Sequence, residues 1–473
     1  MSTGAVAAVD LGATSGRVIV GRVGANELDL ETVGRFPNRP VETVNGLHWD
    51  LLGLYRGVVG GLTEAVRSEP QIASIGIDSW AVDYGLFRGG RMLGTPFHYR
   101  DERSAAGVEA THAVVPFEEL YRRNGLQFLP FNTVYQLAAE KHGGLLDLAD
   151  TMLLVPDLIG YFLTGESVAE RTNASTTGLL DVSTGEWDTE LASRLGIPTG
   201  ILPRLVGAGE RVGSLLPYAR RELGTDRAID VVAVGSHDTA SAVVAVPMQA
   251  ESAAYISCGT WGLVGVELET PVLTDAAREA NFTNEGGVDG RVRFLHNVMG
   301  LWLLSESVRT WERGGDTIDL PTLLAAAADV TAPVAVFDAN DPRFIAPGDM
   351  PERIAEWCRE NGAPVPASHA EFARSIVESL AQAFADAVHT AAELSGRTVE
   401  SIHIVGGGSL NELLCQLTAD RSGLPVLAGP VEATAIGNVL VQARAQGFVE
   451  GDLEALRALV AQAFAPSRFA PRA

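Results

Sequence analysis

Short apolar runs rich in β-branched residues alternate along this chain with stretches of helical periodicity. Strands buried in a parallel sheet are apolar along most of their length and are joined by helices. The alternation therefore predicts α/β layers rather than an all-helical or all-β fold. The expected strands are AVAAVDL (5–11), RVIVGRV (17–23), IASIGID (72–78), VVAV (231–234), AAYIS (253–257) and IHIV (402–405).

One helix is especially clear, in the stretch EFARSIVESLAQAFADAVHTAAEL (371–394). An apolar residue recurs at every fourth position from Phe372 to Val388, which places these side chains along one face of a helix. Gly396 follows the pattern and is expected to end the helix, because glycine readily adopts the left-handed conformation found there.

A chain of 473 residues is longer than a single hydrophobic core usually supports, so two domains are expected. We predict domains at 1–247 and 248–473, because a helical pattern breaks at VPMQAES (246–252) and a new strand pattern follows. Both domains begin with a strand, a turn and a second strand, in residues 5–23 and 253–269. This weak internal repeat predicts two related domains that face one another.

The chain has 59 acidic and 35 basic residues and a formal net charge of −24, which disfavours nucleic acid as a partner. The three cysteines lie far apart and the nine histidines form no closely spaced ligand motif, so we expect no disulfide framework and no metal cage. The sequence shows no signal-peptide pattern and no uncharged apolar stretch of about 18 residues. We therefore expect a cytoplasmic protein without a membrane partner.

The turn in VDLGATSGR (9–17) has the composition of a phosphate-binding loop. Gly12 and Gly16 permit backbone conformations in which several amides point at one anion, and the nearby hydroxyls and Arg17 add donors. Asp10 would repel a phosphate directly but suits a bound Mg²⁺, which prefers carboxylates together with phosphate oxygens. The alternative interpretation is an ordinary glycine-containing hairpin.

Two further glycine-containing turns lie in the second half of the chain. GGGSLN (406–411) follows an expected strand and precedes an expected helix, so a ligand could approach the backbone closely near a helix N-terminus. CGTWG (258–262) is a weaker signal. The sequence contains neither the GxxxxGK[ST] pattern of a P-loop nor a GxGxxG that fits a dinucleotide-binding fold.

Asp238 follows an expected strand, within VGSHDTASAV (234–243), and precedes a small-residue helical pattern. An aspartate in this place commonly caps the helix. Next to phosphate-type turns, however, it could serve as a general base that accepts the proton of a hydroxyl during transfer of a γ-phosphoryl group.

Several longer motifs resemble those of a known family. The chain is similar to the FGGY family of carbohydrate kinases, within the actin-like, ribonuclease H-like ATPase superfamily. The resemblance extends over nearly the whole chain, through motifs that include VDLGATSGR (9–17), IGIDSWAVDYGL (75–86), NEGGVDGRVRFLHNVMGLWLL (284–304) and AGPVEATAIGN (428–438). Its more specific motifs are NGLQFLPFNTVYQL (124–137), TNASTTGLLDVSTGEWD (172–188), HDTASA (237–242) and HNVMGLWLL (296–304). It implies two ribonuclease H-like domains facing a central cleft, with the sugar bound mainly by the first and ATP, with Mg²⁺, mainly by the second.

Site residues follow from the motif positions. The resemblance implies that Asp238 is the catalytic base and that nucleotide is contacted by Ala13, Thr14, Ser15, Gly16, Arg17, Thr260 and Gly407. It implies sugar contacts from Ala81, His237, Asp238, Thr239 and Asn297. Two positions depart from the family pattern, since Ala81 replaces a glycine and Ser305 replaces a glutamine that touches nucleotide. Trp80 and Asp83 are further candidates for the sugar site.

The reaction that the resemblance implies is transfer of the γ-phosphoryl group of MgATP to a sugar hydroxyl, and the motifs most similar to those of one branch of the family imply the 1-hydroxyl of L-rhamnulose. Two alternatives remain open. One is a kinase of the same family acting on another ketose or polyol, such as L-fuculose or xylulose. The other is an actin-like ATPase module without a sugar substrate, which would not need the acid that HDTASA presents.

Overall fold

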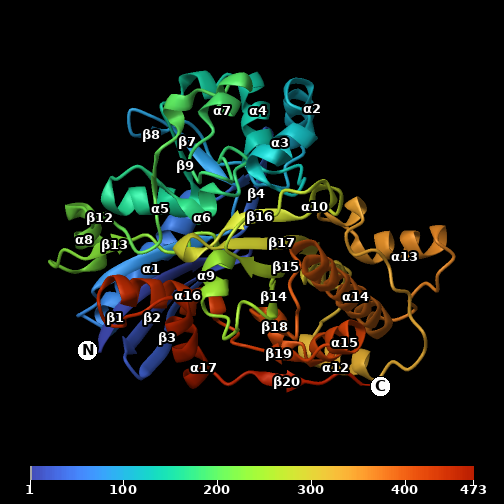
Figure 1. Cartoon of the computed structure of the whole chain (residues 1–473). Coiled ribbons are helices and arrows are strands. Elements are labelled where there is room, and N and C mark those ends of the chain that lie inside the picture. The colour runs from blue at the N-terminus through green and yellow to red at the C-terminus, as the bar shows by residue number, and fades with distance from the viewer. Residues whose placement is uncertain (1–2, 473) are drawn as a thin grey trace. The chain divides into compact units, whose positions relative to one another are not determined.

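The computed structural model describes residues 3–472, which form two compact units (Figure 1). The first unit contains the chain up to Pro247 together with Leu268–Phe294 and Ala433–Ala463. The second contains Met248–Glu267, Leu295–Glu432 and the C-terminal segment that starts at Phe464. The predicted boundary at residue 247 coincides with the end of the first segment, but two later segments also pack into the first unit.

A six-stranded sheet in the order β12-β13-β6-β1-β2-β3 forms the centre of the first unit. Strand β1 is antiparallel to β2 and parallel to β6, and β6 is parallel to β13. The strands are β1 (Gly4–Leu11), β2 (Ser15–Gly24), β3 (Glu27–Pro37), β6 (Ser74–Ser79), β12 (Arg211–Ser214) and β13 (Asp230–Val232). The sheet confirms the prediction of α/β layers.

The sheet of the second unit repeats this arrangement, with neighbours in the order β17-β15-β14-β18-β19-β20. Strand β14 is antiparallel to β15 and parallel to β18, and β18 is parallel to β19. The strands are β14 (Ala253–Cys258), β15 (Trp261–Leu268), β17 (Val292–Met299), β18 (Ser401–Val405), β19 (Val426–Ala428) and β20 (Ser467–Phe469). The equivalent pairing in the two units confirms the predicted internal repeat.

Helices and shorter strands complete each unit. The first contains α1 (Leu51–Ser68), α2 (Ser104–Val114), α3 (Phe117–Asn124), α4 (Thr133–Gly143), α5 (Val155–Thr164), α6 (Arg171–Ala174), α7 (Thr189–Arg194), α8 (Pro217–Leu223), α9 (Asp238–Val244), α10 (Asp275–Glu279), α16 (Ala433–Ala445) and α17 (Leu453–Ala463). Its shorter strands are β4 (Pro40–Thr43), β5 (Gly46–Trp49), β7 (Tyr84–Arg88), β8 (Arg91–Met92), β9 (Thr151–Leu154), β10 (Val168–Glu170), β11 (Arg204–Val206) and β16 (Thr283–Gly286). The second unit contains α11 (Trp302–Arg313), α12 (Leu320–Ala328), α13 (Met350–Glu360), α14 (His369–Ser395) and α15 (Glu412–Ser422). In the described part of the chain, no helix has the length and hydropathy of a membrane span.

The clearest predicted helix is confirmed as α14, which ends before Gly396 in the left-handed conformation at φ 67°. The Ser368 side chain caps its N-terminus by accepting a hydrogen bond from the Glu371 amide. The expected strand at 231–234 is shorter than predicted, because pairing ends at Val232. The chain then runs through Gly235 and Ser236 into α9.

Helix α16 lies beside β1 and β2 of the first unit, as the red helix and blue strands of Figure 1 show. It also crosses α9 at very close range, because a Cβ at Gly437 would lie only 1.8 Å from the Ser241 carbonyl oxygen of α9. Only a residue without a side chain allows this approach. The position of α9, and therefore of Asp238, thus depends on Gly437.

Replacing Gly437 with alanine should lower the stability of the first unit by about 1–3 kcal/mol, because the added methyl group must push two helix backbones apart. Gly60→Ala is the matched control: Gly60 lies within α1 and a Cβ there would have no neighbour within 4 Å. The control should gain about 0.5–1 kcal/mol from helix propensity. Scanning calorimetry of both variants measures the difference, and equal melting temperatures would contradict the packing described here.

Candidate active site

Three carboxylates gather at the carboxyl ends of neighbouring strands in the first unit. Asp10 on β1 is paired in register with Asp78 on β6. Ser79, the next residue, forms a parallel bridge with His237, and its amide donates to the Ser236 carbonyl at 2.9 Å. Asp238 therefore starts α9 beside the other two acids. The carboxyl ends of parallel strands are where open α/β sheets bind ligands.

Charge repulsion and burial shape this acidic group. The pKa of Asp78 is raised well above its usual value, first by burial and then by the nearby Asp10 carboxylate. The Asn438 amide of α16 opposes this rise by donating to Asp78 Oδ2 at 2.6 Å. Arg17 forms an ion pair with Asp10 at 2.7 Å. The arginine of the predicted phosphate turn thus compensates the carboxylate predicted to hold Mg²⁺.

The predicted phosphate turn is the hairpin between β1 and β2. The Gly12 amide donates to the Ser15 carbonyl at 2.9 Å, and Asn38 fastens the turn by donating its Nδ2 to the Gly12 carbonyl at 2.9 Å. The side chains of Thr14 and Ser15 are exposed, Ala13 is half-buried and Gly16 is buried. The hairpin thus has an exposed tip with free hydroxyls and a rigid base, as a phosphate contact requires.

Asp238 does not cap α9, so that interpretation of the sequence is wrong. His237 occupies the N-cap position, and no side chain makes a capping hydrogen bond there. The Asp238 Oδ1 atom instead accepts a hydrogen bond from the Thr239 hydroxyl at 3.1 Å. Its side chain is 30% exposed, whereas that of Asp10 is 4% exposed. A carboxylate that is accessible and has no capping role can meet a substrate hydroxyl.

His237 contacts a buried ion pair through its Nδ1 atom, while its Nε2 atom lies on the side of Asp238. Its Nδ1 atom lies 3.0 Å from an Arg293 guanidinium nitrogen and 3.3 Å from Glu285 Oε2, and its Nε2 atom lies 3.5 Å from Asp238 Oδ1. Arg293 and Glu285 are themselves 3.1 Å apart. The histidine therefore connects this ion pair to Asp238.

Glu170 fixes the loop that leads into His237. Its buried Oε2 accepts hydrogen bonds from the amide and hydroxyl of Ser236, both at 3.0 Å, and from the amide and hydroxyl of Thr172, at 3.0 and 2.5 Å. Burial raises the pKa of Glu170, while these donors act to lower it. One carboxylate thus joins the TNAS segment to the residue before His237.

The segment from Trp80 to Asp83 is strained and held by hydrogen bonds. Val82 has φ 67°, a left-handed conformation that is costly for a β-branched residue, and Thr133 donates to its carbonyl at 2.7 Å. Asp83 Oδ2 accepts from the indole nitrogens of Trp49 and Trp80 at 2.6 and 3.0 Å. Half-buried Ala81 lies between these fixed points. Backbone strain of this kind concentrates at functional sites.

The predicted residues of the second unit are also brought together within that unit. Thr260 lies in the turn between β14 and β15, and Gly407 begins a short 3-10 turn after β18. A Cβ at Gly408 would lie 2.3 Å from Cys258 Sγ, so the triple-glycine loop packs directly on the hairpin that carries Thr260. The Leu301 amide donates to the Gly259 carbonyl at 2.9 Å, which joins this turn to the end of β17, the strand that carries Asn297.

The donor set near Asp10 fits a hard cation. Asp78 Oδ1 is buried and has no hydrogen-bond partner among the described residues, and it belongs to the strand paired with that of Asp10. Carboxylate oxygens are the ligands that Mg²⁺ prefers. Among the side chains that the structure describes, no three or more acidic, cysteine or histidine residues form a group that could hold a metal ion by themselves. Phosphate oxygens and water would therefore complete the coordination.

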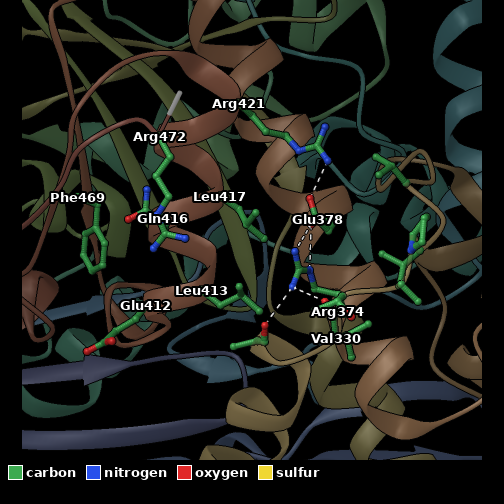
Figure 2. Close-up of a pocket in the computed structure, with 16 residues that line it drawn as sticks. Val330, Arg374, Glu378, Glu412, Leu413, Gln416, Leu417, Arg421, Phe469 and Arg472 are labelled. Carbon is green, nitrogen blue, oxygen red and sulfur yellow. Dashed lines mark hydrogen bonds and ion pairs between the residues drawn. The ribbon is translucent and has the colours of Figure 1, made fainter.

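A cavity of about 750 Å³ lies elsewhere in the second unit, along α14 and α15 (Figure 2). The Glu378 carboxylate is held there between Arg374, which donates at 2.8 and 2.9 Å, and Arg421, which donates at 2.6 Å. The two guanidinium groups and the one carboxylate leave a net charge of about +1 in this group. None of the predicted site residues is among the described residues that line this cavity.

Comparison with known proteins identifies the class of protein. Residues 5–245 match the N-terminal domain and residues 254–446 the C-terminal domain of the FGGY family of carbohydrate kinases. The chain belongs to this family and is a phosphotransferase of the carbohydrate kinase class, as predicted.

The chain is also similar to particular members of the family. A rhamnulokinase of Pectobacterium atrosepticum is 44% identical over 473 residues, which cover 99% of this chain and 93% of the relative. A rhamnulokinase of Bacteroides thetaiotaomicron is 40% identical, with 98% and 95% covered. A ligand-bound xylulose kinase from Lactobacillus acidophilus has a TM-score of 0.80 at 17% identity, with 99% of this chain and 94% of that chain covered. This last likeness confirms the two-domain kinase fold.

Several residues of the site were not predicted. Asp78, Glu170, Glu285 and Arg293 contact predicted residues or their loops, and Asn438 contacts Asp78. Asp78 and Asn438 lie within IGIDSWAVDYGL (75–86) and AGPVEATAIGN (428–438), two motifs of the family resemblance. Asn438 and Gln442 also stand out as polar residues about one helical turn apart in a mostly apolar helix. The signal available in the sequence was a charged or amide side chain at a fixed place within a motif.

Asp83 should make stability depend on pH. Burial raises its pKa to about 6, so between about pH 4 and 6 the folded state binds a proton that the unfolded state has released, and stability falls as the pH rises. At about 1.4 kcal/mol per pH unit, the free energy of unfolding falls by about 3 kcal/mol over this range. Asp83→Asn should remove it, while Asp29→Asn, at an exposed carboxylate, should not. Calorimetry at pH 4.5 and 7 should detect about 2 kcal/mol of this loss, and parallel curves for wild type and Asp83→Asn would refute the assignment.

Proposed function

We propose that this chain phosphorylates L-rhamnulose at its 1-hydroxyl with MgATP, giving L-rhamnulose 1-phosphate and ADP. The choice of sugar is supported by the similarity, over almost the whole chain, to proteins named rhamnulokinase. The observation that carries the chemistry is Asp238, a part-exposed carboxylate that caps no helix and lies beside Asp10 and Asp78 at the strand ends.

The reaction follows from the roles of these residues. As the sugar oxygen attacks the γ-phosphorus, Asp238 accepts the proton of the 1-hydroxyl, and the bond from the γ-phosphorus to the oxygen of the departing ADP breaks. His237, Thr239, Ala81 and Asn297 are proposed to position the sugar. Residues Ala13 to Arg17, Thr260 and Gly407 are proposed to contact the nucleotide.

Asp10, together with Asp78, would hold Mg²⁺, which would neutralise charge on the phosphate oxygens. Arg17 is already next to Asp10, so it can share its charge with an arriving phosphate. The side chain at position 305 is a serine, so no nucleotide contact is assigned to it.

A panel of substrates tests the choice of sugar. ADP release, followed with a coupled assay on L-rhamnulose, L-fuculose, L-ribulose, D-xylulose and glycerol, should show the highest kcat/KM with L-rhamnulose. The reason is that the sugar must meet fixed polar groups, and a site built to bind hydroxyls discriminates strongly against a misplaced one. Higher efficiency with another sugar would transfer the proposal to that sugar, and ATP hydrolysis unaffected by every sugar would overturn it.

Asp238→Asn tests the chemistry. Asparagine is nearly isosteric but cannot accept a proton near neutral pH, so kcat should fall by about 10²–10⁴. Asp29→Asn is the matched control, because it makes the same change at an exposed carboxylate that has no place in the proposed site. Calorimetric titration with sugar and nucleotide would show that the variant still binds both. A folded, ligand-bound Asp238→Asn protein with kcat within a few-fold of wild type would refute Asp238 as the base.

A further inference from the structure

Arg293 is one of the largest fully buried side chains of the described chain, and it points at the histidine that precedes the proposed base. Its Nε donates to the Gly286 carbonyl of β16 at 2.9 Å, which fixes the guanidinium plane. One terminal nitrogen then lies 3.0 Å from His237 Nδ1 and 3.1 Å from Glu285 Oε2. A buried arginine is costly unless such partners compensate it.

Arg293 and Glu285 compete for the same nitrogen of His237. An arginine can only donate, so its hydrogen bond requires Nδ1 to be an acceptor without a proton. Glu285, at 3.3 Å from Nδ1, would favour the opposite tautomer, in which Nδ1 carries the proton. The arginine contact is the shorter of the two and has hydrogen-bond geometry. The arrangement therefore favours the proton on Nε2.

We propose that Arg293 is a positioning residue that keeps the ring proton of His237 on Nε2, and that Glu285 compensates the charge of Arg293. The effect on rate rests on the proposed function, because it acts through Asp238. The tautomer itself does not, because it follows from contacts within the first unit.

The tautomer decides which of two adjacent groups can act as the base. With the proton on Nε2, the histidine presents an N–H toward Asp238 Oδ1, 3.5 Å away, and has no free lone pair on that side. His237 then cannot take the proton of the sugar hydroxyl, and Asp238 remains the acceptor. The opposite tautomer would turn an imidazole lone pair toward the carboxylate and remove a donor that faces the sugar.

Nitrogen NMR of the protein labelled with ¹⁵N-histidine reads the tautomer directly. The His237 signals are assigned by their loss in His237→Asn. The wild type should show a protonated Nε2 and an unprotonated Nδ1 for His237. A wild-type His237 with its proton on Nδ1, or on both nitrogens, at neutral pH would overturn the proposal.

Substitutions then test the cause. Arg293→Met should move the proton to Nδ1, where Glu285 remains as the partner, while Arg293→Lys and Glu285→Gln should keep it on Nε2. Arg457→Met is the matched control, since Arg457 is also buried and donates to the Val243 carbonyl of α9 at 3.1 Å without contacting His237. An unchanged tautomer in Arg293→Met would overturn the proposal. If Arg293→Met does not fold, a proton on Nδ1 in Glu285→Gln would overturn it equally.

Kinetics separates this inference from the proposed function. Arg293→Met should lower kcat/KM for the sugar about 10- to 100-fold, with partial recovery in Arg293→Lys and a change below about 3-fold in Arg457→Met. A changed tautomer with unchanged kcat/KM would overturn the positioning role. Full activity of Asp238→Asn would overturn the proposed base but leave the NMR result on Arg293 standing.

Discussion

The contact between α16 and the sheet of the first unit is the constraint on which the site depends. Two polar side chains of α16, Asn438 and Gln442, are fully buried against β1 and β6. Gln442 donates to the Ala7 carbonyl at 3.0 Å and accepts from the Ser74 hydroxyl at 2.8 Å. A Cβ at Gly76 would lie 2.5 Å from Asn438 Oδ1 and 2.6 Å from Gln442 Nε2, so the glycine leaves the space that these two amides occupy. Buried amide groups must form hydrogen bonds, so α16 can pack on the sheet only in the register that gives Asn438 and Gln442 these partners.

The same contact between α16 and the sheet also positions the carboxylates of the candidate active site. Asn438 donates to Asp78, and Gly437 brings α16 onto α9, the helix that begins with Asp238. The segment that carries α16 comes from the far end of the sequence, yet it belongs to the first unit. The C-terminal part of the chain therefore sets the position of groups that the N-terminal part supplies, and a truncation before α16 would remove the support of the acidic cluster.

Much of the fold could be predicted because its signals are local. Apolar runs in the sequence predicted the strands β1, β2, β6, β14 and β18. The recurrence of an apolar residue at every fourth position predicted the helix α14. The return of Leu268–Phe294 and Ala433–Ala463 to the first unit could not be predicted, because it depends on packing between residues distant in sequence. The same limit applies to the site. The sequence indicated Asp238 and His237, but the capping interpretation could be rejected only once His237 was seen at the N-cap, and Arg293 gained a role only through its contact with His237.

The two units share a topology but differ in what they place at the strand ends. In the first, Asp10 and Asp78 are the second-last residues of β1 and β6 and face one another in register. In the second, β14 and β18 lead into Gly259 and Gly406, and backbone from the two turns meets at Cys258. Carboxylates can hold a cation and accept a proton but repel phosphate, whereas bare backbone lets a ligand approach amide groups without repulsion. Under the proposed function, the glycine-bearing strand ends of the second unit suit a polyphosphate in a chain of net charge −24, and the neutral sugar is proposed to lie beside the acids. One duplicated architecture thus provides two chemically different surfaces because different residues stand at equivalent strand ends.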